Sequence, residues 1–185
     1  MTEEFGGARV HYPPGAFGQS NLGIAEQIVA HIRERIPAGA QVMEFYAGVG
    51  AIGLSLLGGI GRLTLNEVSP PSLFGLQLGL AELPEVLRAK VDVVPGAAES
   101  ALHAAVGSQV VIVDPPRRGL DRQLSQFLAT QPPEHLIYVS CGLASFVNDA
   151  GLLVAGGKMS LVELTAFNLM PFTEHVETVA RFQRI

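Results

Sequence analysis

The only cysteine of the chain, Cys141, follows a short apolar run, and Asp114 follows another. A cysteine thiolate is an inherently strong nucleophile, and a carboxylate can orient a substrate or move a proton. A single cysteine forms no intramolecular disulfide and no cysteine-rich zinc site, so any role of this thiol is solitary. By type alone a lone cysteine is more often a small buried hydrophobe, and its neighbours must decide between the two interpretations.

The segment VVIVDPPRRGL, residues 110–120, presents Asp114 at the end of a predicted buried strand. Pro115 and Pro116 fix φ and lack an N–H, so the turn that follows is rigid and extended. An enzyme that methylates an amino group of a base would need an aromatic side chain after the prolines, and Arg117 at that place argues against this chemistry. Arg117 can instead hold a phosphate or anchor the loop.

The run MEFYAGVGAIGL, residues 43–54, places Gly48, Gly50 and Gly53 in a G-x-G-x-x-G pattern between a predicted strand and a predicted helix. Residues without a Cβ let the backbone approach a ligand, and the start of the helix presents free N–H groups. Glu67 ends the next β-rich run, where a carboxylate can accept hydrogen bonds from a ribose. The pattern predicts a nucleoside cofactor, and it suits NAD enzymes and S-adenosylmethionine methyltransferases alike.

Short β-rich runs alternate with helical patterns along most of the chain, which predicts right-handed βαβ crossovers and a parallel sheet. The β-rich runs cover 41–46, 62–68, 91–95, 109–116 and 135–141, and the helical patterns cover 22–35, 51–58, 70–81, 97–106, 121–129 and 143–154. Two final β-like runs, 158–167 and 175–185, have no helix between them and predict an antiparallel hairpin. Residues 1–16 show no periodicity, so we expect an irregular loop there.

These elements predict one doubly wound α/β domain over residues 1–185, with a mostly parallel seven-stranded sheet. In such sheets ligands bind at the carboxyl ends of the strands. Asp114 and Cys141 follow neighbouring predicted strands, so we expect both to face one cleft. Their proximity favours the nucleophile over the buried hydrophobe as the interpretation of Cys141.

The composition limits the class of protein. Hydrophobic residues make up 48% of the 185 residues and charged residues 16%, which excludes an intrinsically disordered chain. No apolar run is long enough to span a bilayer, and the acidic start lacks the pattern of a signal peptide, so we expect a soluble cytoplasmic protein with no membrane partner. The net charge of −5 argues against a strong autonomous nucleic-acid binder, although Arg117, Arg118 and Arg122 cluster and could form a local basic face.

A thiol beside a carboxylate suits one particular reaction on a pyrimidine ring. C5 of the ring is too poor a nucleophile to attack an electrophilic methyl group directly, and a thiolate that adds to C6 converts the ring into an enolate. After methyl transfer the C5 proton has to leave, so a general base is also required.

Segments along nearly the whole chain resemble, in order, the motifs of the RNA (uracil-5-)methyltransferase family. They are FGQSN (17–21), MEFYAGVGAIGL (43–54), NEV (66–68), VDPPRRGL (113–120), YVSC (138–141) and MPFTEHVETVARF (170–182). The resemblance implies a Rossmann-like fold of the S-adenosylmethionine-dependent methyltransferases, S-adenosyl-L-methionine as the methyl donor, and 5-methyluridine in tRNA or rRNA as the product.

The same resemblance assigns roles to individual residues. Cys141 matches the nucleophile that adds to C6, Glu177 matches the base that removes the C5 proton, and Asp114 is placed to touch both cofactor and uracil. Cofactor positions are Gln19, Tyr46, Gly48, Gly50, Glu67 and Asp114, and substrate positions are Arg117 and Gln19. Gln19 could equally cap the first helix, and His175 is left as a structural or orienting residue. No metal is expected.

The sequence departs from the family pattern at Ala51, Ala97 and Gly142, and we expect no counterpart in it of the further N-terminal RNA-binding regions that family members carry. We therefore expect an RNA substrate to require an additional RNA-binding domain or partner. Three alternatives stay open: a methyltransferase with a non-RNA acceptor, a non-catalytic relative, and a nucleotide-binding oxidoreductase. The last leaves the DPPRRG and YVSC segments unexplained.

Overall fold

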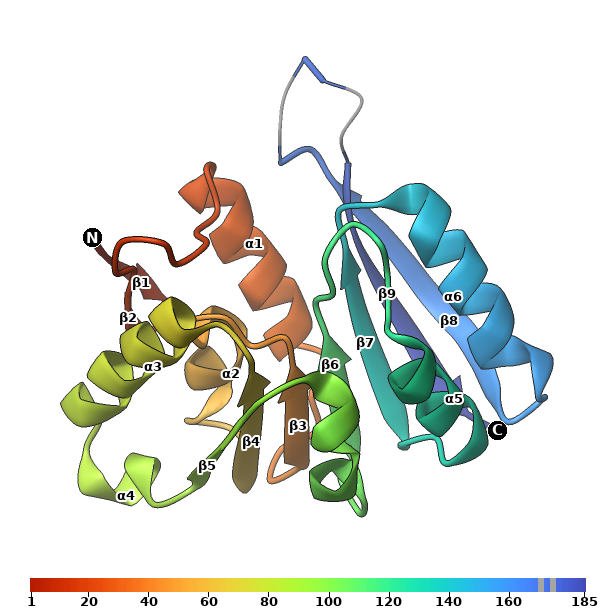
Figure 1. Cartoon of the computed structure of the whole chain (residues 1–185), viewed down its shortest axis with the longest axis horizontal. Helices are drawn as coiled ribbons and strands as arrows, with labels where there is room; N and C mark the ends of the chain where they lie inside the picture. The colour runs from red at the N-terminus through yellow and green to blue at the C-terminus, as the bar shows by residue number, and fades with distance from the viewer. Residues whose placement is uncertain (170–171, 174–175) are drawn as a thin grey trace.

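The computed structural model describes residues 1–169, 172–173 and 176–185. Within these residues the main sheet has seven strands in the order β5-β4-β3-β6-β7-β9-β8 (Figure 1). Their bounds are β3 (Gln41–Phe45), β4 (Arg62–Glu67), β5 (Val91–Pro95), β6 (Val110–Val113), β7 (His135–Ser140), β8 (Met159–Phe167) and β9 (Glu177–Arg184).

The sheet is mostly parallel, because β3 pairs in parallel with β4 and β6, and the outer strands β5 and β7 continue this direction. Only β9 breaks it, since it runs antiparallel between β7 and β8. The chain leaves β3 first toward β5 and then returns to β6, which creates a switch point at the carboxyl ends of β3 and β6. The predicted doubly wound, seven-stranded fold with its antiparallel hairpin is confirmed.

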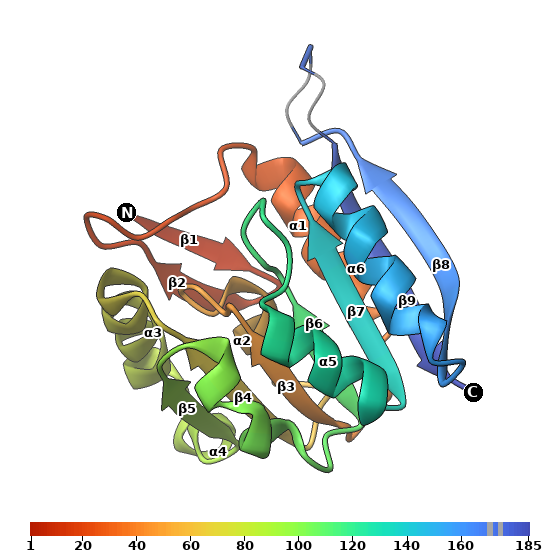
Figure 2. The same ribbon diagram turned by 45° about the vertical axis from the view of Figure 1, so that its right-hand side comes forward.

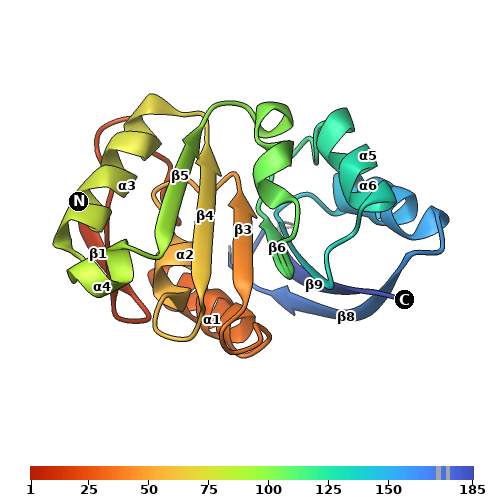
Figure 3. The ribbon, with the colours of Figure 1, turned by 90° about the horizontal axis from the view of Figure 1, so that it is seen from below.

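Helices cover both faces of the sheet (Figure 3). The helices are α1 (Leu22–Arg33), α2 (Ala51–Leu56), α3 (Pro70–Glu82), α4 (Glu85–Arg88), α5 (Arg122–Thr130) and α6 (Leu143–Ala155). Apolar side chains that alternate along each strand form one core with α1, α2 and α3 and a second with α5 and α6. No helix among the described residues is long and apolar enough to cross a bilayer.

Local sequence signals explain where the helices begin. The Asn21 side chain accepts a hydrogen bond from the backbone N–H of Ile24 and caps α1. Ser69 caps α3, which has proline in its first turn, and Asp121 caps α5 by accepting from Leu124 N at 2.9 Å. The caps satisfy backbone donors that have no partner inside the helix.

The expectation of an irregular loop over residues 1–16 is wrong. β1 (Thr2–Phe5) and β2 (Ala8–His11) form an antiparallel hairpin that lies beside α3 (Figure 2). Gly6 and Gly7 have φ of +55° and +86°, as a two-residue hairpin turn requires. The strands have only four residues each, too few for a clear alternation, so the Gly-Gly pair was the signal for this hairpin.

The predicted helix over 97–106 is also wrong in type. The structure has two short 3₁₀ helices there, Ala98–Ser100 and Leu102–Ala105. Gly96 and Gly107, with φ of +127° and +86°, bound the segment, and Ala101, with φ of −102° and ψ of 3°, separates the two 3₁₀ turns.

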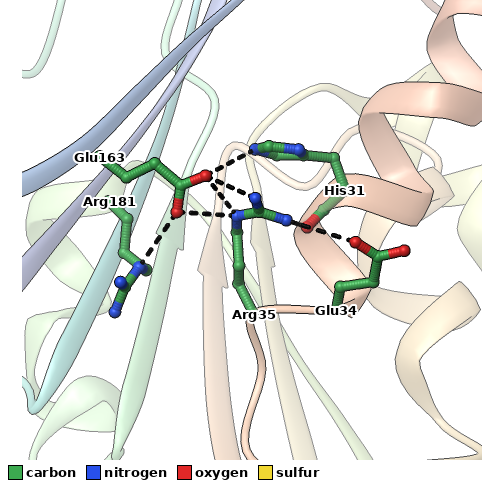
Figure 4. Close-up of polar contacts among 5 residues, drawn as sticks. All are labelled: His31, Glu34, Arg35, Glu163 and Arg181. Carbon is green, nitrogen blue, oxygen red and sulfur yellow. Dashed lines mark hydrogen bonds and ion pairs between the residues drawn. The ribbon is translucent and has the colours of Figure 1, made fainter.

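Side chains that flank α1 at its two ends tie this helix to the β8–β9 hairpin (Figure 4). The Arg35 guanidinium donates to both carboxylate oxygens of Glu163 on β8, with Nε at 2.9 Å from each. Arg181 Nε of β9 lies 3.5 Å from the same carboxylate. At the start of the helix, Asn21 Nδ2 donates to the carbonyl oxygen of Leu169 at 3.3 Å. The β8–β9 hairpin is therefore held against α1 at two places, and Glu177 is the first residue of its strand β9.

Candidate active site

The carboxyl end of β7 and the amino end of the antiparallel strand β9 bring Cys141 and Glu177 together. In the antiparallel pairing of β7 and β9, Val139 lies opposite Val179 and Ser140 lies opposite Thr178. The next position on each side of this ladder is Cys141 against Glu177. The sequence predicted both residues as catalytic, but their juxtaposition depends on the insertion of β9 beside β7.

Asp114 adjoins the same pair, because β6 lies next to β7 in parallel register with Val113 opposite Tyr138. Burial raises the pKa of Asp114 to about 7. Glu177 is 4% exposed, and burial followed by the charge of Asp114 raises its pKa to about 8. Near neutral pH the two carboxyl groups therefore retain protons that exposed carboxyl groups would have lost.

Cys141 is partly buried, and some of the groups around it raise the pKa of the thiol while another lowers it. Burial raises the pKa of the thiol, and the carboxylates of Glu177 and Asp114 raise it further. The Arg117 guanidinium acts in the opposite sense, through its charge and a hydrogen bond to the sulfur. The structure thus brings together the three predicted catalytic residues and one predicted substrate residue, whose roles stay predictions.

The Gly loop between β3 and α2 has the backbone that its sequence requires. Gly48 and Gly50 have φ of +59° and +85°. A Cβ on Gly48 would meet no atom within 4 Å, so a ligand can approach this backbone directly. The Gly48 N–H donates to Glu67 Oε2 at 2.7 Å, and Glu67 Oε1 accepts from Val68 N and Ser69 N. Glu67 thereby fixes the loop in this structure, and its predicted contact with a ribose remains a prediction.

Tyr46 precedes the Gly loop in the left-handed region, with φ of +61°. Such a conformation is costly for a residue with a side chain and persists where contacts hold it. Here the Tyr46 hydroxyl donates to Asp121 Oδ2 at 2.9 Å, and burial together with this hydrogen bond raises the pKa of the phenol. The contact joins the Gly loop to the end of the loop between β6 and α5.

Two further predicted site residues are less enclosed. Gln19 is partly buried two positions before Asn21, which is the residue that caps α1, and Gln19 makes no hydrogen bond to another described residue. Arg117 is exposed. The prediction for His175 falls outside the described residues, as do residues 170, 171 and 174 of the last motif.

Sequence reasoning missed Glu44 on β3. This carboxyl group is 1% exposed, and burial, then the charge of Asp114, raises its pKa to about 8. A Cβ on Gly53 would collide with Glu44 Oε2, which explains why the Gly pattern needs its third glycine. An acidic residue inside an apolar strand just before the Gly loop was the available signal.

A cavity of about 580 Å³ lies away from the candidate active site, at the edge of the sheet where β6 and β7 begin. Among its lining residues, Lys158 Nζ donates to the Thr130 carbonyl at 2.8 Å and Arg184 contacts the Pro132 carbonyl at 3.5 Å. These two cations are thus engaged with backbone, and Arg184 also pairs with Glu134 at 3.9 Å. The described residues hold no cluster of His, Cys, Asp and Glu that could bind a metal ion.

Comparison with known proteins adds independent information. The sequence model of the tRNA (Uracil-5-)-methyltransferase family matches residues 98–185. An RNA methyltransferase of Protochlamydia amoebophila is 34% identical over all of this chain and 48% of its own length. The 23S rRNA (uracil(747)-C(5))-methyltransferase of Edwardsiella ictaluri is 28% identical over all of this chain and 48% of its own length.

A solved structure agrees with these sequence matches. The tRNA (uracil-54, C5)-methyltransferase of Pyrococcus abyssi, in complex with S-adenosyl-L-homocysteine, superposes with a TM-score of 0.82 and 25% identity. The match covers 98% of this chain and 44% of that one. This chain therefore spans about half the length of the relatives that it matches. In sequence and in fold, the chain is thus similar to RNA (uracil-5-)methyltransferases.

Proposed function

We propose that residues 1–185 act as a single catalytic domain that transfers a methyl group from S-adenosyl-L-methionine to C5 of a uridine in RNA. The observation that carries this proposal is the register of β7 and β9, which ends with Ser140 opposite Thr178 and so brings Cys141 and Glu177 together, with Asp114 at the end of the adjoining strand. A nucleophile, a base and an orienting carboxyl group are the groups that methylation at C5 of uracil requires.

The Gly loop and the strand ends around it are suited to hold the cofactor. Gly48 leaves its backbone open to a ligand, and Glu67 lies at the end of the next strand. We assign Tyr46, Gly50, Asp114 and Gln19 to the same binding site on the strength of the motif. When bound, S-adenosyl-L-methionine supplies an electrophilic methyl group, so the protein's own part is to make C5 nucleophilic and to remove its proton.

The proposed reaction begins with the target uridine turned out of its stack. The Cys141 thiolate adds to C6, and the electron pair of the C5–C6 double bond moves into an enolate. With the cofactor bound, C5 would take the methyl group in line as the bond from that group to the sulfonium sulfur breaks, which would leave S-adenosyl-L-homocysteine. The Glu177 carboxylate then removes the C5 proton, the C5–C6 double bond re-forms, and the bond from C6 to sulfur breaks to release the thiolate.

The electrostatics of the site support this division of roles. Arg117 favours the thiolate form of Cys141, which is the form that adds to C6, against the burial and the two carboxyl groups that raise the pKa of the thiol. With a pKa of about 8, Glu177 is increasingly ionised as the pH rises toward and past that value. Both the attacking thiolate and the base therefore become more abundant with rising pH, and we expect turnover to increase from pH 6 to about pH 8.

For the RNA substrate we propose only its class, which is tRNA or rRNA. One relative acts on 23S rRNA and another on tRNA, according to their names, so the comparison does not choose between these substrates. The net charge of −5 is unfavourable for binding RNA, and the relatives are about twice as long. We propose that a further RNA-binding region or partner supplies affinity, and that the protein works in the cytoplasm.

The test is Cys141→Ala in a methyl-transfer assay with tRNA and rRNA transcripts. We expect turnover to fall to background, and we expect the wild-type chain, unlike the variant, to form a covalent adduct with RNA that contains 5-fluorouridine. Titration of both proteins with S-adenosyl-L-homocysteine is the control, because loss of the thiol should leave cofactor affinity within about twofold. Turnover by the variant would contradict the mechanism, and a folded wild-type chain that binds no S-adenosyl-L-homocysteine would favour a non-catalytic relative.

A further inference from the structure

Asp149 on α6 is a buried carboxylate that none of the proposed catalytic steps uses. Its side chain is 8% exposed. One oxygen, Oδ2, accepts the backbone N–H of Leu120 at 2.9 Å and the hydroxyl of Tyr138 at 2.6 Å. Leu120 belongs to the loop between β6 and α5, and Tyr138 belongs to β7. One side chain thus connects α6, β7 and the loop that begins with Asp114.

The loop is shaped to receive this carboxylate. Gly119 has φ of +86°, and a Cβ there would lie 2.5 Å from Asp149 Oδ2. A residue with a side chain would therefore be strained and would also displace Asp149. The fit of Gly119 against Asp149 indicates a specific contact between the loop and α6, because neither the backbone angle nor the available space admits another residue.

Contacts one turn earlier in α6 join the loop to the start of the same helix. The Ser145 hydroxyl lies 2.8 Å from the carbonyl oxygens of both Arg117 and Gly142, so it can donate to either. A Cβ on Gly142 would lie 2.9 Å from Arg117 O. Gly142 directly follows Cys141, so the Arg117 backbone packs against the residue beside the thiol. Figures 1 and 2 show this loop beside the carboxyl end of β7, where α6 starts.

Burial of a carboxylate carries a desolvation cost that the packing of α6 alone does not require. A purely structural explanation for Asp149 is that the hydroxyl of Tyr138, a fully buried residue, needs an acceptor. That need does not account for the second hydrogen bond, from Leu120 N, or for the fit of Gly119. A charged acceptor makes shorter and stronger hydrogen bonds than a neutral one, which suits a contact that has to hold a loop in one position.

We propose that Asp149 is a positioning residue for methyl transfer: it fixes the loop between β6 and α5 so that Asp114 and Arg117 stay in place around Cys141. This inference rests on the proposed function. Asp149 touches neither the thiol nor the other catalytic groups, and it acts through the backbone of Leu120.

The experiment compares Asp149→Ala and Asp149→Asn with Tyr138→Phe. Tyr138→Phe removes the hydrogen bond within the core and leaves the one from Leu120, so it controls for a loss of stability. We expect Asp149→Ala to slow adduct formation with 5-fluorouridine RNA on the order of 10- to 100-fold, because small displacements of reacting groups are costly. S-adenosyl-L-homocysteine affinity should change by less than about twofold, and Asp149→Asn, whose amide oxygen can still accept from Leu120, should recover part of the rate.

Tyr138→Phe should keep adduct formation within about twofold of wild type at a temperature where it is folded. Equal losses in Asp149→Ala and Tyr138→Phe, or a wild-type rate in Asp149→Ala, would overturn the proposal. If Asp149→Ala does not fold, Ser145→Ala tests the same loop through the Arg117 carbonyl and should slow the adduct in the same way.

Backbone hydrogen exchange separates this inference from the proposed function. Exchange at Leu120 should be faster in Asp149→Ala than in Tyr138→Phe, whether or not the chain methylates RNA. A wild-type chain that forms no adduct would reject the proposed function. Unchanged exchange at Leu120 in Asp149→Ala would reject the role of Asp149 in holding the loop.

Discussion

Glu44 places a carboxyl group in the interior of β3, beneath the first turn of α2 and in the electrostatic range of Asp114 and Glu67. Its atom Oε2 has no hydrogen-bond partner. A buried carboxyl group without full compensation holds its proton, as its pKa of about 8 indicates. The protonated acid can also pack beneath the Gly loop without adding a negative charge beside Asp114.

This residue should make stability depend on pH. The ordinary pKa of this carboxyl group is 4.5. Between about pH 4.5 and 8, the folded state therefore keeps a proton that the unfolded chain has already released. Stability therefore falls as pH rises through this window, by up to about 1.4 kcal/mol per pH unit for one proton. Glu44→Gln should remove this part of the slope and raise the urea midpoint relative to wild type at pH 8.

Urea unfolding of both proteins at pH 5, 6, 7 and 8 measures the effect. At pH 5 the two midpoints should nearly coincide, since Glu44 is then protonated in the fold. Asp114 and Glu177 have pKa shifts of the same direction and leave a residual slope in the variant. Parallel pH profiles for the two proteins would show that Glu44 is not the group that takes up the proton.

At the scale of residues, the sequence located a site residue where its type and its position at the end of a predicted strand were enough to place it. Asp114 and Cys141 could be placed at one edge because parallel strands end there. Asp149 could not be found in this way, because it acts on a loop distant in sequence, and Glu44 was overlooked although an acidic residue inside an apolar strand is a signal. Only the packing of Gly53 and Gly119 against them reveals the contact.

Among the elements, the β8–β9 hairpin depends most on contacts to a distant segment. It reaches the sheet through β7 and is tied to α1 through the ion pair of Arg35 with Glu163. The side chains are 23% and 27% exposed, so solvent screens the pair only in part. The edge of the His31 ring also meets Phe167, at 5.3 Å between centroids, and Phe167 is the strand partner of Glu177.

We expect this ion pair to contribute about 1 kcal/mol to stability, measured as the coupling in a double-mutant cycle of Arg35→Gln and Glu163→Gln. The hydrogen bond from Arg35 lowers the pKa of Glu163, so the contribution is present above the ordinary value of 4.5 and is lost as pH falls through the lower folded value. The exposed pair of Arg62 and Asp92, whose side chains are 58% and 47% exposed, is the matched control and should couple more weakly. Equal coupling in the two cycles would contradict this account.

The order of elements was predictable from hydrophobic periodicity, since long strands and helices alternate clearly. The β1–β2 hairpin and the 3₁₀ segment were not, because both are shorter than the window over which periodicity can be judged. The antiparallel direction of the last strands followed from the missing helix between them. Their order in the sheet, with β9 inside β8, did not follow from any local pattern.

Across the whole molecule, the arginine side chains differ in whether they form ion pairs. Arg9, Arg62 and Arg184 form ion pairs with acidic side chains. Arg118 and Arg122, which lie on the loop beside the candidate active site and at the start of α5, are exposed and form no ion pair with another described residue. An acidic protein thus keeps positive charge without an ion pair at the edge that holds the candidate active site.

Arg118→Gln should weaken the binding of single-stranded RNA and reduce its salt dependence. Each lost phosphate contact lowers the slope of log K against log salt by about 0.7 to 1. Arg88→Gln is the control, because Arg88 is also exposed and without an ion pair among the described residues, but it lies on α4, which leads to the opposite edge of the sheet. Titrations at several salt concentrations measure both variants, and an equal slope change in the two would argue against a path for RNA over Arg118.

The position of β9 also determines when the site can exist during synthesis. β9 is made after β8 but inserts between β8 and β7, so the ribosome completes Asp114 and Cys141 well before the strand that brings Glu177 opposite the thiol. Until then β7 has an unpaired edge, which is a target for wrong pairing. A nascent chain can therefore expose its nucleophile before it has its base, and chaperone protection of that edge would serve both the sheet and the chemistry.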